Sequence, residues 1–354
     1  MYDVLAVHQA LVQIPSLSHE EGPIADWVED FLRRQGLPTG RIADNVYAWL
    51  GEDPSDTLLL NSHLDVVPPS EGHPFPPFAA VVQNGAVYGR GAVDAKASVA
   101  AMIVALAELA SEGYRPPGRV IVALTACEEL GGGYNGLEQI RPALEPLHAA
   151  IIGEPTSLQP CVAQKGVLIL TLTARGRSAH AARGHLGENA ILKAAQDILR
   201  LQALRFDRED PFLGYPTVAV TTISGGTARN VIPEQCVFTV DIRSTPAYEH
   251  EELVALIQEQ VSSEVSVYSQ RIVPVRTPLE ARIVRACLRA LPGAKPFGSP
   301  TASDWVFLRD LPVVKLGPGS SELSHTAQEH VPIAELRRAV AVYKAIIRSY
   351  FELP

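Results

Sequence analysis

Several common functional signatures are missing from this 354-residue chain, and each absence excludes a class of function. The four cysteines, Cys127, Cys161, Cys236 and Cys287, lie far apart and form no C-x-x-C pair. A zinc site built from thiolates is therefore not expected, and the spacing is typical of a reduced, cytoplasmic protein. Excess basic charge is missing too, because the formal net charge is -9. Nucleic-acid-binding surfaces are usually basic, so a nucleic-acid partner is not expected.

Signals for membrane insertion and nucleotide binding are missing as well. The apolar stretches are interrupted before they reach the length of a membrane span, and the segment 1–16 has no signal-peptide pattern. No G-x-x-x-x-G-K-[ST] motif occurs. The stretch "GRGAVD" places Asp94 where a dinucleotide-binding loop has its third glycine. A carboxylate there would repel a pyrophosphate, which argues against a nucleotide-dependent oxidoreductase.

The pattern of the chain changes near residues 161 and 272. Residues 1–160 alternate helical spacing with short apolar strands, which predicts an α/β domain with a mostly parallel sheet and helices on both faces. Residues 161–272 follow the order strand-helix-strand-strand-helix-strand, which is typical of a smaller, inserted α+β sandwich domain. Residues 273–354 return to the first pattern. The chain is therefore predicted to form a catalytic domain from 1–160 and 273–354, interrupted by the inserted domain.

Individual elements follow from hydrophobic spacing and from turn residues. Helices are predicted at 2–13, 23–36, 95–113, 189–204, 248–264, 278–291 and 334–351, with Gly36 and Gly113 as C-terminal stops. Strands are predicted at 57–63, 119–127, 148–155, 167–176, 216–226, 235–244 and 312–318.

Residues that bind metals or move protons cluster where predicted strands end. They are His63 and Asp65 in "NSHLDVVP", Asp94 in "GRGAVDAKAS", Glu128 and Glu129 in "TACEELGG", Glu154 in "IIGEPTS", and His325 in "ELSHTAQEHV". The carboxyl ends of strands in an open α/β sheet form the crevice where ligands bind, so these side chains are predicted to converge. Each alone has a plainer explanation. A carboxylate at a strand end is often a helix cap, and a lone histidine is often structural.

The combination of two histidines and several carboxylates without thiolates suits a pair of zinc or cobalt ions. A bridging carboxylate can hold two divalent ions close together, and a neighbouring free carboxylate can accept a proton from a water molecule. Adjacent side chains in an extended segment point to opposite sides. The chain after Cys127 must therefore turn if Glu128 and Glu129 are to face the same crevice, and the glycines that follow allow such a turn.

The blocks "HLDVVP", "GRGAVDAKAS", "TACEELGG", "GEPTS" and "SHTAQEHV" occur in this order along nearly the whole chain. With them the chain resembles the dinuclear zinc amidohydrolases and exopeptidases. That family includes acetylornithine deacetylase, succinyl-diaminopimelate desuccinylase, aminoacylase and the glutamate carboxypeptidases. The resemblance implies two bound Zn²⁺ ions, with Co²⁺ as a substitute, and hydrolysis of a linear amide bond.

The resemblance also implies a role for each matching metal-site residue. His63 and Glu154 match the ligands of one zinc ion, Glu129 and His325 match those of the other, and Asp94 matches the carboxylate that bridges them. Relatives often have a cis peptide after this aspartate, so one is expected between Asp94 and Ala95.

Three further residues match catalytic positions of the family. Glu128 matches the general base, which later acts as the acid, and Asp65 matches the carboxylate that orients a histidine ligand. His180, in "GRSAHAA", matches the histidine that donates to the oxyanion, which in dimeric relatives comes from the other subunit. A polar turn histidine is the alternative for His180.

Two of the residues expected to bind substrate follow from the same resemblance, and a glycine-rich turn adds a third contact. Arg243 and Asn230 match positions that hold the substrate carboxylate, and Gly317 and Gly319 in "LGPGSS" are expected to offer backbone N–H groups to it. Lys165 and Ser303 are further candidates. Arg243 has an alternative role in a salt bridge within the inserted domain. Asp304 is expected either to meet a basic side chain or to begin a helix.

The expected substrate is a small N-acyl amino acid, and no membrane partner is expected. N-acetylornithine is placed first, N-acetyllysine-type compounds next, and N-succinyl-diaminopimelate and dipeptides remain alternatives. This ordering implies a role in arginine or lysine biosynthesis. A homodimer formed through residues 161–272 is expected from the family. A non-catalytic binding relative would have lost a ligand or the base, and neither is missing in this sequence.

Overall fold

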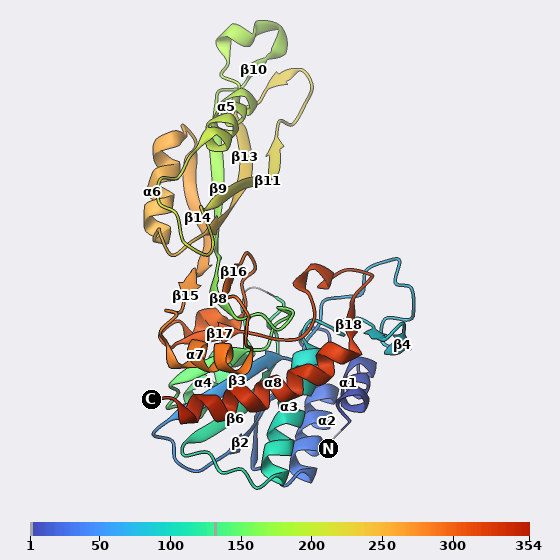
Figure 1. Cartoon of the computed structure of the whole chain (residues 1–354). Helices are drawn as coiled ribbons and strands as arrows, with labels where there is room; N and C mark the ends of the chain where they lie inside the picture. The colour runs from blue at the N-terminus through green and yellow to red at the C-terminus, as the bar shows by residue number, and fades with distance from the viewer. Residues whose placement is uncertain (1–2, 131–132) are drawn as a thin grey trace. The chain divides into compact units, whose positions relative to one another are not determined.

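The computed structural model describes residues 3–130 and 133–354, which divide into two compact units (Figure 1). The larger unit comprises Met1–Val162, Thr277–Phe297 and Ser303–Pro354, and the smaller comprises Ala163–Arg276 with Gly298–Ala302. The sequence predicts 161–272 for the smaller unit, whereas the compact unit runs from Ala163 to Arg276 and also includes Gly298–Ala302. That segment belongs there because the Lys165 N–H donates to the Ser299 carbonyl over 3.1 Å. A pairing between such distant residues leaves no local signal in the sequence.

The larger unit is built on a sheet with the strand order β1-β2-β6-β3-β7-β17-β8. The strands are β1 (Thr39–Ile42), β2 (Asn45–Leu50), β3 (Thr57–His63), β6 (Arg119–Thr125), β7 (Ala149–Ile152), β17 (Val313–Lys315) and β8 (Cys161–Gln164). The pairs β3–β6, β3–β7 and β7–β17 are parallel, whereas β1–β2, β2–β6 and β17–β8 are antiparallel. The expected α/β class with a mostly parallel central sheet is therefore confirmed.

The register of the central strands aligns their carboxyl ends. His63, the last residue of β3, lies opposite Thr125, the last residue of β6. On the other side of β3, Asn61 lies opposite Ile152, which ends β7. The segments that carry the paired glutamates and Glu154 therefore leave the sheet at the same edge as His63.

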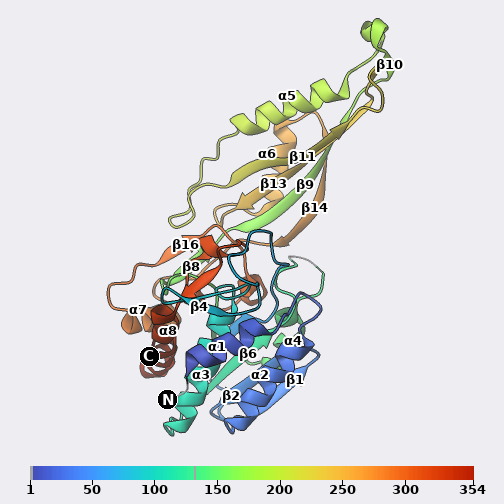
Figure 2. The same ribbon diagram turned by 90° about the vertical axis from the view of Figure 1, so that its right-hand side faces the viewer.

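Helices surround this sheet, some in contact with it and others packed on those helices, as shown in Figure 1 and, from the side, in Figure 2. They are α1 (Val4–Gln13), α2 (Gly22–Arg34), α3 (Lys96–Ser111), α4 (Gly136–Leu144), α7 (Arg282–Ala290) and α8 (Ile333–Glu352). Every residue of α3 from Lys96 to Leu109 is buried, because α1 and α8 pack on it as well as the sheet. The expected stops are confirmed: Gly36 (φ 71°) follows α2 and Gly113 (φ 71°) follows α3, both in the left-handed region.

A small three-stranded sheet was not expected. It consists of β4 (Val81–Gln83), β5 (Ala86–Tyr88) and β18 (His330–Pro332), in the order β18-β5-β4. Each strand has only three residues, too few to show a period of two. The β18–β5 pairing sets His330 opposite Tyr88, and so brings the loop that bears His325 next to the loop that bears Asp94.

The structure also contains three short 3₁₀ helices and two short strands. They are η1 (Ala181–Leu186), η2 (Asp304–Leu308), η3 (Ser321–Leu323), β15 (Val275–Arg276) and β16 (Phe297–Ser299). Within the described residues, no helix is both long enough and apolar enough to cross a bilayer.

The smaller unit has a four-stranded antiparallel sheet in the order β11-β13-β9-β14. Its strands are β9 (Gly166–Arg175), β11 (Thr217–Gly225), β13 (Gln235–Ser244) and β14 (Glu264–Ile272). Helices α5 (Ala190–Ala203) and α6 (His250–Gln260) pack on it, and α5 runs along the strands in Figure 2. Leu170, Phe238 and Val240 lie in the core between them, all fully buried. A separate two-stranded pairing joins β10 (Ala179–His180) to β12 (Val231–Ile232).

His8, on the buried face of α1, gives the larger unit a pH-dependent stability. Its Nε2 donates to the Ala92 carbonyl over 2.8 Å, while Nδ1 has no partner among the described residues. Burial lowers the pKa of His8 to about 4, nearby Lys96 adds to the shift, and the hydrogen bond to Ala92 opposes it. Because the folded pKa lies below the unfolded value, this contribution to stability is complete above about pH 6.5 and is lost as the pH falls toward 4.

His8→Gln, which keeps an N–H donor but cannot titrate, is therefore expected to flatten this dependence. Between pH 7.5 and pH 4 the unmodified chain should lose about 3 kcal/mol more unfolding free energy than the variant. Urea unfolding followed by tryptophan fluorescence measures this, since Trp27, Trp49 and Trp305 all lie in the larger unit. An identical pH dependence in both proteins would show that His8 does not titrate in this range.

Candidate metal centre and active site

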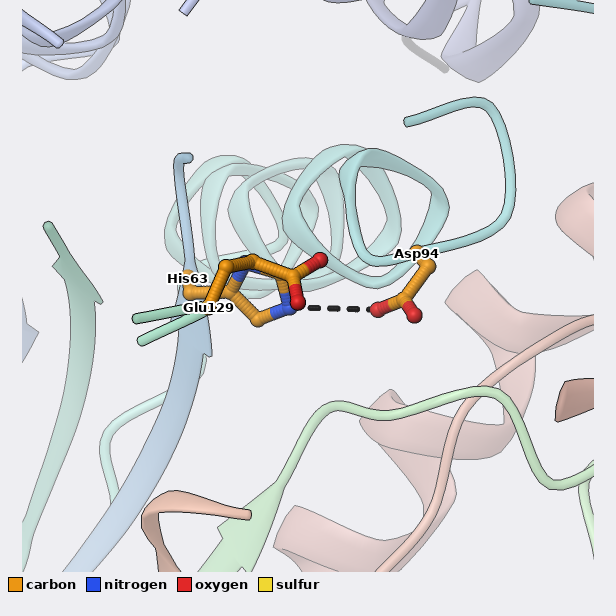
Figure 3. A group of neighbouring side chains, drawn as sticks. All are labelled: His63, Asp94 and Glu129. Atoms are coloured by element: carbon orange, nitrogen blue, oxygen red, sulfur yellow. Dashed lines mark hydrogen bonds and ion pairs between the residues drawn. The ribbon is translucent and has the colours of Figure 1, made fainter. Parts of the chain in front are cut away.

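His63 lies at the tip of β3 with both ring nitrogens engaged. Its side chain is almost fully buried, and its Nδ1 lies 2.9 Å from the Asp65 carbonyl and 3.4 Å from Asp65 Oδ1. A proton on Nδ1 satisfies these acceptors and leaves the Nε2 lone pair free to bind a cation. Nε2 faces Asp94 Oδ1 at 3.2 Å and Glu154 Oε1 at 3.7 Å. Figure 3 shows His63 and Asp94 directed at each other, with Glu129 beside them.

Asp94 is held at the N-terminal end of α3 by a buried ion pair. The Glu329 carboxylate accepts the N–H groups of Val93 (3.1 Å) and Asp94 (3.2 Å). Arg90 Nη1 lies 2.5 Å from Glu329 Oε2, and both side chains are 1% exposed. Arg90 Nη2 also donates to the His325 carbonyl over 3.3 Å. This pair therefore joins the loops that carry Asp94 and His325. The expected cis peptide between Asp94 and Ala95 is confirmed.

Glu128 and Glu129 follow β6 in a turn that directs both carboxylates toward His63. Cys127, just before them, has φ 58°, in the left-handed region, so the chain does not continue as a strand. Glu128 groups with His63 and Glu154, and Glu129 groups with His63 and Asp94; in each group the ligand atoms lie within 4.8 Å of one another. The glycines expected to assist the turn include Gly131 and Gly132, which lie outside the described residues.

His325 completes the cluster from the loop before β18. Its Nε2 lies 3.0 Å from the Glu129 carboxylate and 3.5 Å from Asp94 Oδ2. Asp94 thus faces His63 with one oxygen and His325 with the other. A carboxylate placed in this way could be shared between two bound ions.

The charge balance of the cluster fits bound divalent cations. Burial raises the pKa of Glu128 well above its usual value, and neighbouring carboxylates add to the shift. Burial, followed by repulsion from Asp94, raises the pKa of Glu154 to about 8. Burial also raises the pKa of Glu129, against the hydrogen bond from His325. One buried and three partly buried carboxylates face two imidazoles, so their ionised forms would carry an excess of negative charge, which zinc-type ions with oxygen and nitrogen ligands would neutralise.

Asp304 is a buried neighbour of this cluster whose partners the sequence analysis did not anticipate. Its Oδ1 accepts from Asn135 Nδ2 over 2.7 Å, and its Oδ2 accepts from Thr125 Oγ1 over 3.3 Å. It thereby links the two ends of the segment that carries the paired glutamates. Burial raises the pKa of Asp304 to about 6. The alternative that Asp304 begins a helix agrees with its place as the first residue of η2. The sequence also provided no indication that Arg90 and Glu329 support the site.

His180, Asn230, Arg243 and Lys165 all belong to the smaller unit. The Asn230 carbonyl accepts the Ala181 N–H over 2.9 Å, so Asn230 lies beside His180. The Arg243 guanidinium binds Asp241 at 2.9 Å and 3.1 Å, which is the salt bridge considered as its alternative. Lys165 Nζ donates to the Tyr215 carbonyl over 2.9 Å.

Gly317, Gly319 and Ser303 belong to the larger unit, and one expectation about them needs correction. The Gly317 N–H already donates to Thr156 Oγ1 over 3.1 Å, so it is not free to bind a substrate carboxylate. A Cβ on Gly317 would lie 2.2 Å from Ser98 Oγ and 2.5 Å from the Glu154 carbonyl, so close packing explains this glycine. Gly319 has φ 82°, and Ser303 caps η2.

Comparison with known proteins identifies the family. A model described as "Peptidase family M20/M25/M40" matches residues 59–349. The chain belongs to this family. It is 29% identical to succinyl-diaminopimelate desuccinylase of Rhodospirillum centenum over 379 residues, covering 99% of this chain and 97% of that one. It is 30% identical to the enzyme of that name from Cereibacter sphaeroides over 381 residues, covering 99% of each.

Solved structures of the family share the fold. Aminopeptidase PepT from Bacillus cereus superposes with a TM-score of 0.81 at 22% identity, covering 98% of each chain. A dinuclear metal binding peptidase of family M20 from Bacillus subtilis superposes with a TM-score of 0.74 at 16% identity, covering 97% of this chain and 96% of that one. The family is metal-dependent and acts on amides or peptides, so this chain is an M20 metallo-hydrolase with a candidate metal site at the tips of its central strands.

Proposed function

We propose that the protein hydrolyses the amide bond of a small N-acyl amino acid at a site for two zinc ions. The observation that carries this proposal is the placement of Glu128 and Glu129 beside His63, with Glu154 and Asp94 completing the two groups. A single bound ion would need only one of the two adjacent glutamates, Glu128 or Glu129, as a ligand. Two adjacent carboxylates facing one cluster allow one to bind metal and the other to move protons.

The contacts within the cluster support the ligand assignment that the family resemblance implies. His63 and Glu154 would hold one ion, Glu129 and His325 the other, and Asp94 would bridge them. Two such ions, when bound, lower the pKa of a water molecule and polarise the acyl carbonyl. Asp65 would keep His63 in the tautomer that presents Nε2. Co²⁺ accepts the same oxygen and nitrogen donors and would substitute for Zn²⁺.

Glu128 would move the proton. In the proposed reaction it accepts a proton from the attacking water and delivers it to the nitrogen of the departing amine. The raised pKa of its carboxyl, caused by burial and by neighbouring carboxylates, favours the protonated form that donates to the leaving group. Bound cations would lower that pKa again, which suits acceptance of the first proton.

His180 would stabilise the negative charge that develops on the carbonyl oxygen. Its Nδ1 accepts the Ala182 N–H over 3.1 Å, so in the neutral ring the proton lies on Nε2, which is then a donor. His180→Ala is expected to lower kcat about 10²-fold, as the loss of an oxyanion donor does. Steady-state kinetics on the purified protein measures this, and an unchanged kcat would remove the oxyanion role.

The smaller unit is also proposed to form a homodimer. Apolar side chains are exposed on α5 and on the edge strand β11, namely Leu192 (61%), Leu199 (64%) and Ile223 (55%). Mixing His180→Ala with Glu128→Gln tests whether one site uses both chains. Recovered activity requires a site that takes His180 from one chain and Glu128 from the other, whereas a mixture as inactive as its components means that each site uses one chain.

A hydrolysis panel tests the substrate class. It should contain N-succinyl-diaminopimelate, N-acetylornithine, N-acetyllysine, N-acetylcitrulline and several dipeptides, each with added Zn²⁺ or Co²⁺. The relatives named succinyl-diaminopimelate desuccinylase support placing the succinyl compound first. A relative named as a probable carboxypeptidase, from Aspergillus flavus and 29% identical, keeps peptides as the second candidate. If the metal-loaded protein hydrolyses no amide on the panel, the proposed function is wrong.

A further inference from the structure

Residues 16–21, between α1 and α2, place two polar side chains against the segments that carry Asp65 and the paired glutamates. Ser18 Oγ donates to Asp65 Oδ2 over 2.7 Å. Glu21 Oε1 accepts the Cys127 N–H over 2.9 Å, and Glu21 is only 1% exposed. A buried carboxylate needs hydrogen-bond donors, and this one takes them from the turn before Glu128. Neither side chain has a role in the proposed reaction so far.

The contact from Glu21 lies at the point where the chain changes direction. Cys127 has φ 58°, a conformation that residues other than glycine keep only where the surroundings hold it. Glu21 Oε1 accepts from both the Cys127 N–H and the Cys127 Sγ, the latter over 3.3 Å. Glu21 therefore helps to hold the turn that sends Glu128 and Glu129 toward His63.

The contact from Ser18 acts through Asp65. Asp65 Oδ1 accepts the Glu128 N–H over 3.0 Å, and Oδ2 accepts the Glu129 N–H over 3.1 Å. One fully buried carboxylate thus fixes the backbone of both glutamates while it also faces His63. Ser18 donates to one of these two oxygens, so it fixes the rotation of the carboxylate that makes all of these contacts.

The segment is itself anchored beside Asp65. Ser16 Oγ donates to the Leu64 carbonyl over 2.7 Å, and the Ser16 carbonyl accepts the Val66 N–H over 2.9 Å. Leu17 forms a parallel bridge with Val66. Ser18 and Glu21 consequently project from a backbone that is tied to the loop after β3.

We propose that Ser18 and Glu21 are positioning residues, which set the placement of Glu128 and Glu129 for proton transfer and metal binding. The kinetic part of this inference rests on the proposed function of that pair. The structural part, that Ser18 and Glu21 hold the turn, does not depend on any activity.

Ser16 provides a matched control for Ser18. Each hydroxyl makes one hydrogen bond of 2.7 Å from the same segment, but Ser16 bonds to a main-chain carbonyl and Ser18 to the Asp65 carboxylate. Ser16 is also the more buried of the two. If the segment serves only stability, Ser16→Ala should cost at least as much activity as Ser18→Ala. If Ser18 positions the glutamates, the order is reversed.

Hydrogen exchange tests the structural part without an assay of activity. In Ser18→Ala, amide exchange at Glu128 and Glu129, followed in a peptide that contains both, should be at least about tenfold faster than in the unmodified protein, because the Asp65 carboxylate that accepts their N–H groups is less fixed. In Ser16→Ala this peptide should exchange at the original rate, because the main-chain contacts of Ser16 and Leu17 with Val66 still anchor the segment. Unchanged exchange in Ser18→Ala, or equal acceleration in both variants, would overturn the role of Ser18.

Steady-state kinetics and Zn²⁺ binding test the kinetic part of the inference. Ser18→Ala and Glu21→Ala should each lower kcat roughly 10- to 100-fold with little change in KM, as the loss of supporting partners does. Glu21→Gln should recover most of the kcat lost in Glu21→Ala, because its amide oxygen still accepts the Cys127 N–H. If Glu21→Ala does not fold, Glu21→Gln replaces it in the test. Zn²⁺ affinity measured by calorimetry should fall for Ser18→Ala and not for Ser16→Ala. A kcat loss in Ser16→Ala that matches Ser18→Ala, or no recovery in Glu21→Gln, would overturn the inference.

The two proposals fail in different ways. If the unmodified protein hydrolyses no amide, the proposed function is wrong, while hydrogen exchange and Zn²⁺ affinity still decide whether Ser18 holds the turn. If the protein is active and Ser18→Ala matches it in kcat and in exchange, only the positioning role is wrong.

Discussion

Glu128→Gln is expected to keep its bound metal and to lose turnover by about 10²- to 10⁴-fold, the range for loss of a general base. The glutamine side chain has the shape of the glutamate but cannot accept a proton from water. The proposed ligands His63, Glu154, Glu129, His325 and Asp94 are unchanged in this variant. Elemental analysis should therefore show that the metal content is preserved. Steady-state kinetics should show that kcat is nearly abolished.

Glu108→Gln is a suitable control for this experiment. Glu108 is a buried carboxylate of the larger unit, 8% exposed, but it pairs with Lys344 Nζ at 2.7 Å and belongs to neither ligand group. Its variant should lose some thermal stability and keep its kcat. Near-normal turnover in Glu128→Gln would remove Glu128 as the base, and a parallel loss of metal would make it a ligand instead.

Asp94→Asn is expected to have the second large effect, because it affects both proposed ions at once. Asp94 Oδ1 faces His63 and Oδ2 faces His325, so an amide in its place offers one oxygen where two are needed. Bound Zn²⁺ should fall from two per chain to one or fewer. Hydrolysis should fall by at least about 10³-fold, since the metal pair contributes several kcal/mol to transition-state stabilisation and 1.36 kcal/mol corresponds to tenfold.

Asp197→Asn controls for the loss of a buried aspartate. Asp197 is fully buried in the smaller unit and accepts the N–H groups of Ser262 at 3.0 Å and Ser263 at 2.9 Å. This variant should lose stability without losing metal. If Asp94→Asn retains two ions per chain and full activity, Asp94 does not bridge them.

The sequence was sufficient to predict that the strand-end side chains would lie together. Parallel strands with aligned carboxyl ends bring His63, Glu128, Glu129 and Glu154 to one edge of the sheet, and each of these residues follows an apolar run that is visible in the sequence. The elements around them were also predictable, because α3 and β6 are long enough to show their spacing.

The residues that support the cluster could not be predicted in the same way. Glu329 pairs with Arg90 across 239 positions, and Glu21 pairs with Cys127 across 106. A single buried charge has no periodicity, so only the folded backbone reveals its partner. The sequence can also suggest a contact that the fold does not leave available. The glycine-rich turn predicted that the Gly317 N–H would be a free donor, but this N–H donates to the Thr156 hydroxyl.

The most direct test of a metal-dependent amide hydrolase is a zinc titration of the chelator-treated protein. Turnover of the best substrate from the panel should be absent without metal, should rise with added Zn²⁺, and should level off at two ions per chain. The same titration of Glu128→Gln should bind two ions without producing turnover. Full hydrolysis by the metal-free protein would show that the reaction does not depend on a bound metal.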